Sequence, residues 1–312
     1  MARKLSWSDL TVLRRFQNQR MVLDNSLRFV FNPGLFSSAL LSITLPSSEF
    51  YSAVESLDSS PFPFLFGQIL LGKEDKAARI CSLAPLELGS QPDYSGLISH
   101  LAQAACERGA TQLSGETIKG SPEEEILVRS GFRPYAEQQI WKLPRQISHP
   151  SDQISWVIAG RGDNPAAGTL YQRVVPAQIQ RLEPLALFPG AQGMVSWNEN
   201  RIVGIALTRF GPKGILLDLF LDPSLGPLDG YISALLLSLP YRGLRDVYMR
   251  VRDYQGGIAS ALERLGAQPG EQQRAVVKRL AVHYNAQQAF MVSGFEKQPD
   301  ITTPISRTEI KN

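Results

Sequence analysis

Two segments of the chain have nearly the same sequence, and this internal repeat constrains the fold more than any other feature. Residues 129–139 and 264–273 each contain an Arg, a Gly two positions later, a Pro three further on, and a closing Glu-Gln-Gln. In both copies an amphipathic run ends at the Gly, either Gly131 or Gly266, and an extended segment follows the Pro. This order predicts a helix that ends at Gly and a turn into a strand. We therefore expect a duplicated module.

The length and composition predict two domains with separate cores. The chain has 312 residues, of which 43% are hydrophobic and 20% are charged, as in ordinary soluble proteins. We expect an N-terminal domain over 1–147, a C-terminal domain over 148–285, and a disordered polar tail over 286–312.

Charge and residue usage exclude several classes of partner. The net charge of +3 is too small to predict a nucleic-acid partner. No apolar stretch reaches the roughly 18 residues of a membrane span, and the start of the chain lacks the apolar core of a secretory signal. We therefore expect no membrane partner and a cytoplasmic location. Cys81 and Cys106 suit reduced thiols. The histidines are scattered, so no metal site is expected; they are His100, His149 and His283.

Periodicity predicts alternating helices and strands in both halves. In the first half we expect helices over about 8–24, 34–45, 94–108 and 122–131, and strands over 62–71, 78–83, 112–118 and 132–143. In the second half we expect an opening strand over 154–159, helices over 175–183, 230–239 and 258–265, and strands over 193–197, 202–210, 215–221, 246–254 and 274–282.

This order of elements resembles the GCN5-related N-acetyltransferase (GNAT) fold. The segment 129–135 is similar to the Gly-Phe corner of that family, and each half has a strand that ends in apolar-x-Pro, at Pro85 and Pro223. The resemblance covers about 50–145 and 190–282. It implies an α/β (α+β) fold with two GNAT-like domains in tandem, each a twisted mixed sheet flanked by helices. The tandem layout is similar to that of mycothiol synthase, in which one copy has lost catalysis.

The resemblance implies acetyl-CoA or another acyl-CoA as cofactor. In the family, a turn rich in small residues lets amides at a helix N-terminus approach the coenzyme A pyrophosphate. The first copy carries the better match, and its candidate cofactor-binding residues are Leu83, Leu86, Gln91, Tyr94, Ser95 and Gly96. It departs from the family where Tyr94 replaces the central Gly. Asp93 and Asp229 also stand at the two helix starts, where a carboxylate caps the free amides and opposes an anion.

The catalytic groups implied by the resemblance are incomplete. The family's general acid is a Tyr four residues before the Gly of the corner, but Leu127 and Leu262 occupy these positions and carry no proton. Tyr135 is the nearest phenol in the first half, with a structural Tyr as the alternative. Glu87 and Asp218 are the candidate bases. A carboxylate inside the apolar run 215–221 is costly unless it is paired or used, although an outward position on the strand is the alternative.

A further candidate ligand site lies on the strand over 246–254. Its members alternate, so they share one strand face, and an Arg and Tyr surface suits an anionic or planar ligand. They are Tyr248, Arg250, Arg252 and Tyr254. The alternative is an ordinary charged strand face. The repeated glutamines are expected to form hydrogen bonds within turns or sheets; they are Gln138, Gln139, Gln272 and Gln273.

Two functions from different classes follow. The first is an acyl-CoA-dependent N-acyltransferase that acts on a small-molecule or peptide amine held between the copies. The second is a non-catalytic tandem GNAT-fold pseudoenzyme that serves as a ligand-sensing or protein-interaction module, with its clefts filled by Tyr94 and the capping aspartates.

Overall fold

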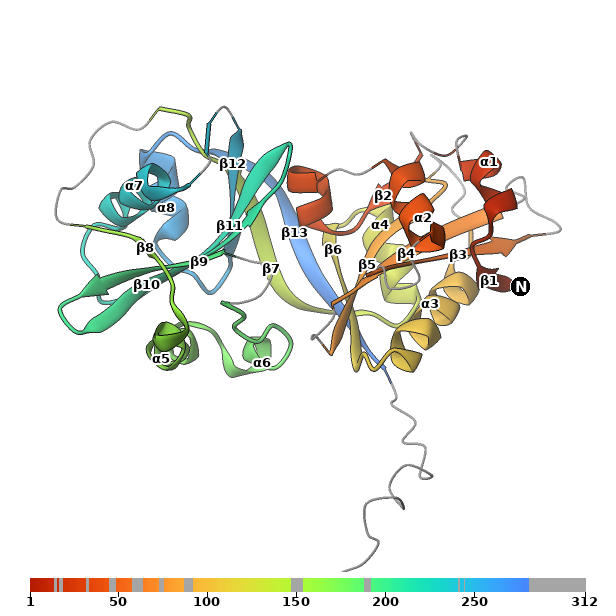
Figure 1. The fold of residues 1–312 in the computed structure, drawn as a ribbon, viewed down its shortest axis with the longest axis horizontal. Coiled ribbons are helices and arrows are strands. Elements are labelled where there is room, and N and C mark those ends of the chain that lie inside the picture. Colours follow the sequence, from red (N-terminus) through yellow and green to blue (C-terminus); the bar gives the residue numbers. More distant parts are fainter. Residues whose placement is uncertain are drawn as a thin grey trace, which may run out of the picture. The chain divides into compact units, whose positions relative to one another are not determined.

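Strands from both copies of the repeat pair into one mixed sheet of thirteen strands (Figure 1). The structure is a computed structural model. It describes residues 1–280 except 14–15, 17–18, 32–33, 45–48, 58–63, 73–75, 87–91, 147–153, 188–191, 241 and 244. The predicted tail and the predicted domain boundary lie outside the described residues.

The first half begins with short elements and continues with four strands, two helices and a last strand. Its strands are β1 (Ala2–Lys4), β2 (Met21–Val22), β3 (Phe50–Ser56), β4 (Phe64–Leu71), β5 (Ala77–Ala84), β6 (Gln112–Ile118) and β7 (Arg133–Lys142). Its helical segments are η1 (Trp7–Asp9), α1 (Leu10–Leu13), the π-helix η3 (Ser26–Phe31), α2 (Leu35–Thr44), α3 (Ser95–Glu107) and α4 (Pro122–Arg129).

The second half repeats this order of elements. Its strands are β8 (Val157–Ile158), β9 (Gln192–Asn198), β10 (Arg201–Phe210), β11 (Gly214–Leu221), β12 (Asp246–Arg252) and β13 (Gln268–Arg279). Its helical segments are η4 (Arg161–Asp163), α5 (Asn164–Val174), α6 (Ala177–Gln180), α7 (Leu228–Ser238) and α8 (Ile258–Arg264). In both halves an antiparallel meander leads into one parallel pair, β5 with β6 or β11 with β12.

The repeated corners have the geometry that the sequence predicts. Gly131 and Gly266 have φ angles of 90° and 76°, the left-handed region in which Gly ends a helix without a steric penalty. Ser121 caps α4 by accepting a hydrogen bond from the amide of Glu124, and Pro122 occupies the first turn. The helix-to-strand corner is therefore confirmed in both copies.

The last strand of each half pairs inside the other half. β13 lies between β6 and β7, and β7 lies between β13 and β12. Gln138 and Gln273 face each other across β7 and β13, and each lies seven residues after the Gly of its corner. Figure 1 shows α1 and α2 above the sheet on the right, and α5 and α6 below it on the left.

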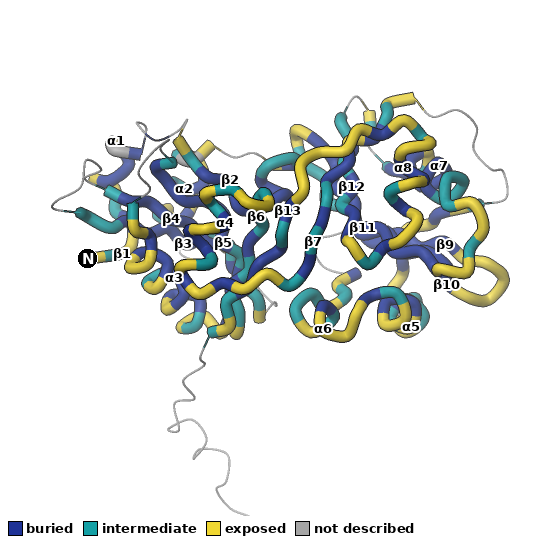
Figure 2. Tube along the Cα trace, turned by 180° about the vertical axis from the view of Figure 1, so that it is seen from behind, coloured by how far each residue is buried: buried dark blue, intermediate teal, exposed yellow. Residues whose placement is uncertain are grey.

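Helices cover both faces of the sheet on either side of its centre, where the strands are largely buried, whereas the central strands β7 and β13 carry many polar and exposed residues. β11 is buried at every residue, as expected for a strand covered on both sides. The core of the first half includes residues of α3, α4, β4 and β5, whereas a second cluster joins α1 and α2 to β3 and β4. In the second half, α7 and α8 contribute to one core and α5 to another. Figure 2 shows β11 as buried and much of the outer helix surface as exposed.

The N-terminal prediction is wrong. In the described part of the segment expected as a helix over 8–24, η1 and α1 are helical, but Met21 and Val22 form a strand instead. Met21 and Leu23 are each only 1% exposed, so tertiary packing outweighs the helical periodicity of this segment. The helix expected over 175–183 is reduced to α6, whereas β3 and α5 were not predicted. Within the described residues, no helix is both long and apolar enough to cross a membrane.

Candidate functional site

The gap between the parallel strands of the first half is filled by the chain itself. β5 and β6 pair only as far as Arg79 and Ser114, and then diverge. Residues 19–25 lie in the gap. Met21 pairs with Leu83 of β5, and the amide of Leu23 donates to the carbonyl oxygen of Cys81 at 2.8 Å.

The same segment also contacts β6. The carbonyl oxygen of Leu23 accepts a hydrogen bond from the amide of Glu116 at 2.9 Å, and the amide of Asn25 donates to the Glu116 carboxylate at 2.7 Å. The segment therefore acts as a short extra strand between β5 and β6. The resemblance implies that the pantetheine arm of coenzyme A lies in such a gap. Residues 19–25 therefore engage backbone groups of β5 and β6 with which the cofactor would form hydrogen bonds.

The described cofactor-binding candidates of the first half are already engaged. The Leu86 amide donates to the Gln19 carbonyl oxygen at 2.5 Å. Tyr94 is 1% exposed, and its hydroxyl donates to the Pro85 carbonyl oxygen at 2.5 Å. Burial raises the pKa of Tyr94. Gln91 and Glu87 lie outside the described residues.

The start of α3 carries negative charge. Asp93 accepts hydrogen bonds from the amide and the hydroxyl of Ser95, each at 2.9 Å, as the sequence predicts. A Cβ atom on Gly96 would lie 2.6 Å from a carboxylate oxygen of Glu55 in β3. Two carboxylates thus lie where a pyrophosphate would have to bind, which opposes binding of an anion.

The second half closes its gap with a side chain. β11 and β12 pair as far as Asp218 and Arg250. Beyond that point the amide group of Gln255 donates to the carbonyl oxygen of Leu219 at 2.5 Å, and its oxygen accepts from the amide of Arg252 at 2.8 Å. Leu219 corresponds to Cys81 of the first half, since each lies four residues before the Pro that follows its strand. The equivalent carbonyl is therefore occupied in both halves.

The helix that follows β11 also begins with a carboxylate. Asp229 lies in the first turn of α7 and forms an ion pair with Arg264 of α8, at 2.6 Å between the closest atoms. Among the described residues, the strand gap is filled in both halves and a carboxylate lies at the start of each helix, so these residues do not fit coenzyme A.

A buried ion network lies on the face of the sheet that the alternating residues of β12 share. Arg250 binds Asp218 through two nitrogens, at 2.6 and 2.7 Å, and binds Glu116 at 2.6 Å. Arg209 of β10 adds a contact to Asp218 at 3.0 Å. Burial favours the neutral carboxyl groups, but the arginines lower the pKa of Asp218 and of Glu116 to about 2. Asp218 is thus held as a carboxylate by two guanidinium groups.

A second polar group lies beside this network. Arg252 donates to the Oε1 atom of Glu183, and the hydroxyl of Tyr135 donates to the same oxygen. Burial and the Glu183 carboxylate raise the pKa of Tyr135. Tyr254 is half-buried, and its pKa is raised to about 12 by burial. Tyr248, in contrast, packs on Phe29 of η3 with ring centroids 4.7 Å apart, away from Glu183.

The repeated glutamines form hydrogen bonds within the sheet, as the sequence predicts. Gln138 donates to Gln273 at 3.0 Å and to Glu116 at 2.9 Å, and Gln139 donates to the carbonyl oxygen of Gly270 at 2.8 Å. Asn25 completes the group by donating to Gln273 at 2.7 Å. These contacts link residues 19–25, which fill the strand gap of the first half, to strands β7 and β13.

Three residues of this region were not predicted. Glu116, Glu183 and Gln255 meet their partners through the fold rather than through sequence spacing. Only Glu116 gave a signal, as a carboxylate within the strand predicted over 112–118. Among the described residues, no group of three or more His, Cys, Asp or Glu side chains could hold a metal ion.

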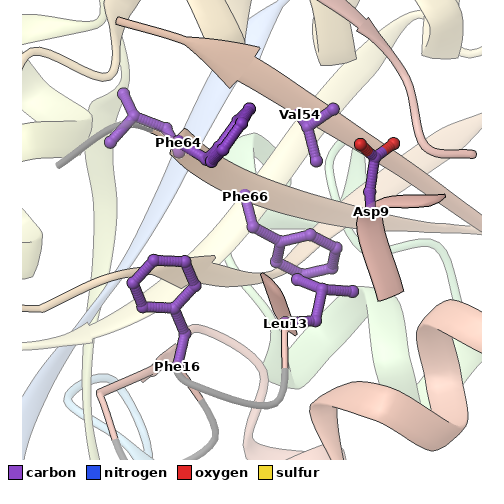
Figure 3. Close-up of a pocket in the computed structure, with 7 residues that line it drawn as sticks. Asp9, Leu13, Phe16, Val54, Phe64 and Phe66 are labelled. Carbon is purple, nitrogen blue, oxygen red and sulfur yellow. The ribbon is translucent and has the colours of Figure 1, made fainter. Parts of the chain in front are cut away.

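Two hollows of the described region lie away from these residues. Figure 3 shows one of about 10 Å³, lined mainly by apolar side chains including Phe16 and Phe66, with Asp9 at its rim. It has room for about one water molecule. An open groove at the start of α4 is lined in part by Glu124 and Arg274, which pair at 2.8 Å. None of the predicted site residues lines either space.

Comparison with solved structures identifies the fold. A GCN5-related N-acetyltransferase from Sphaerobacter thermophilus is similar with a TM-score of 0.51 and 13% identity, over 90% of this chain and 95% of that one. A protein from Pyrococcus horikoshii assigned as an acetyltransferase has a TM-score of 0.51 and 11% identity, over 90% of each chain. No family model and no curated protein sequence matches the chain. The chain has the GNAT fold, as its sequence predicts.

Proposed function

We propose that this chain is a non-catalytic GNAT-fold protein, a ligand-sensing module that does not use coenzyme A. The observation that carries the proposal is the position of residues 19–25 between β5 and β6. Met21 and Leu23 are buried there, and such burial stabilises a protein by about 1.5–3 kcal/mol per side chain. An acyl-CoA would have to displace a part of the folded core.

The second half supports the same conclusion by different means. Gln255 is 7% exposed and satisfies one backbone group on each side of the gap. Withdrawing its side chain would leave the Leu219 carbonyl and the Arg252 amide without these partners. Buried polar groups without partners cost about 1–3 kcal/mol each.

The groups available for chemistry are also unsuited to acyl transfer. Leu127 and Leu262 stand at the positions of the general acid, and both are fully buried. Asp218 has a pKa of about 2 and is paired with two arginines, so it is a weak base near neutral pH.

The competing function is an acyl-CoA-dependent N-acyltransferase with a small-molecule or peptide amine as acceptor. The GNAT fold favours it, but a fold alone does not establish an activity. It requires a strand gap that opens to admit pantetheine. Binding of acetyl-CoA therefore separates the two functions.

The test is thermal unfolding of the purified chain with about 1 mM acetyl-CoA. A ligand at 100 times its Kd stabilises the native state by about 2.7 kcal/mol, which shifts the melting temperature by several degrees. We expect no shift, and no coenzyme A released from the denatured protein. A saturable shift would refute the proposal. Its loss in Gly96→Phe, but not in Gly230→Phe, would then place the cofactor in the first half.

A further inference from the structure

Arg252 has a hydrogen-bonding group that the folded chain leaves unused. Its side chain is 4% exposed, and its Nη1 atom is buried without a hydrogen-bond partner in the described part of the chain. Its Nη2 atom donates to Glu183. A guanidinium normally binds a carboxylate through two parallel hydrogen bonds. One donor of a fixed, buried arginine is therefore left over.

The present partner of Arg252 is the more exposed member of the pair. Glu183 follows α6 in a turn, and its side chain is 31% exposed. Its backbone is held separately, because its amide donates to the carbonyl oxygen of Ile179 at 2.8 Å and its carbonyl oxygen accepts from Tyr171. The carboxylate can thus turn toward solvent while the backbone stays in place.

The charges around Arg252 indicate what would replace this carboxylate. In the ion network and the neighbouring Arg252 pair, the positive charges of three arginines equal the negative charges of three carboxylates. The residues are Arg209, Arg250, Arg252, Asp218, Glu116 and Glu183. When Glu183 turns away, one positive charge remains, which a monoanion neutralises. The Tyr135 hydroxyl, which now donates to Glu183, supplies a further donor, and its ring centroid lies 5.9 Å from the Arg252 guanidinium carbon.

We propose that Arg252 and Tyr135 form a binding site for the carboxylate of a small monoanionic molecule, and that Glu183 occupies this site in the free protein. The inference names the class of ligand for the sensing role proposed above and rests on that role. An incoming carboxylate would take the Tyr135 hydrogen bond and both guanidinium donors, including Nη1.

The test uses acetate, because replacing Glu183 by Ala removes a group equivalent to acetate. Binding is measured by calorimetric titration and by thermal unfolding, with chloride at the same ionic strength as the control. We expect wild-type protein to bind acetate weakly and Glu183→Ala to bind it at least about tenfold more tightly, because the internal competitor is gone. Arg252→Met should abolish binding in both backgrounds.

Each other outcome overturns the inference. These are equal effects of acetate and chloride in Glu183→Ala, binding that survives Arg252→Met, preferential binding of inorganic phosphate, and no binding of acetate to the wild type at about 100 mM. If Glu183→Ala does not fold, Glu183→Gln gives the same comparison, since acetate then competes with an uncharged amide. Acetyl-CoA binding that is unaffected by Arg252→Met would refute the proposed function and leave the acetate result standing, so the two failures are distinguishable.

Discussion

Replacing Arg250 by Met should destabilise the protein strongly and in a pH-dependent way. Arg250 is the shared partner of Asp218 and Glu116, and all three side chains are at most 15% exposed. Met preserves most of the packing of the arginine stem but removes the charge. Two buried carboxylates would then lose their shared ion-pair partner, and Asp218 would keep its ion pair with Arg209.

The magnitude follows from the pKa values of the two carboxyl groups. Both are about 2 in the folded protein, against about 4 in an unfolded chain. A difference of about two pH units corresponds to about 2.7 kcal/mol per group. Because both groups share the same arginine, the two values are not additive. We expect the free energy of unfolding at pH 7 to fall by about 3–5 kcal/mol, as for other broken buried ion pairs.

The sign of the pH dependence is fixed by the direction of these shifts. Groups with a lowered pKa contribute stability above about pH 4 and lose it as the pH falls toward 2. The difference between wild type and Arg250→Met should therefore be largest near pH 7 and shrink between about pH 5 and pH 3. Urea unfolding followed by tryptophan fluorescence measures it at each pH.

A surface ion pair provides the matched control. Arg264→Met breaks an exposed pair with Asp229 and should have little effect at any pH. A loss in Arg250→Met that is the same at pH 7 and pH 3 would show that packing, not charge, is responsible. That result would refute the electrostatic reasoning.

Two further substitutions test the packing. Leu23→Ala should lower the free energy of unfolding by about 2–5 kcal/mol, because Leu23 is 1% exposed in the strand gap; a loss below about 1 kcal/mol in chemical denaturation would argue against the filled gap. Gly204→Ala should cost about 1–3 kcal/mol, since the new Cβ atom would lie 2.6 Å from the ring of Trp156. Gly226→Ala, with no atom within 4 Å of its Cβ position, should have a much smaller effect in the same assay.

The sequence predicted the local structure of the regular segments well. The strand over 112–118 matches β6. The corners at Gly131 and Gly266 could be predicted because a left-handed φ angle favours Gly, which is visible in the sequence. The helix expected over 8–24 failed because residues 21–25 are fixed by contacts with β5 and β6, which lie far away in sequence. Periodicity cannot report such contacts.

The candidate site was predicted in its residue types but not in its pairings. Asp218 was expected to be paired or used, and it is paired with Arg250, which was predicted as a ligand-binding residue. Glu183 was not anticipated, because its contact with Arg252 spans 69 positions and depends on where α6 lies. The sequence also did not predict that β7 and β13 each pair with strands of the other half, because the residue pattern of each strand fits either half.

This exchange has a consequence for how the chain acquires its structure during synthesis. When residues 1–146 have left the ribosome, the edge of β6 still lacks its neighbour, because β13 spans Gln268–Arg279 and is made later. An unpaired strand edge is a site for aggregation until it is covered. The sheet of the first half therefore cannot be completed before β13 has been translated.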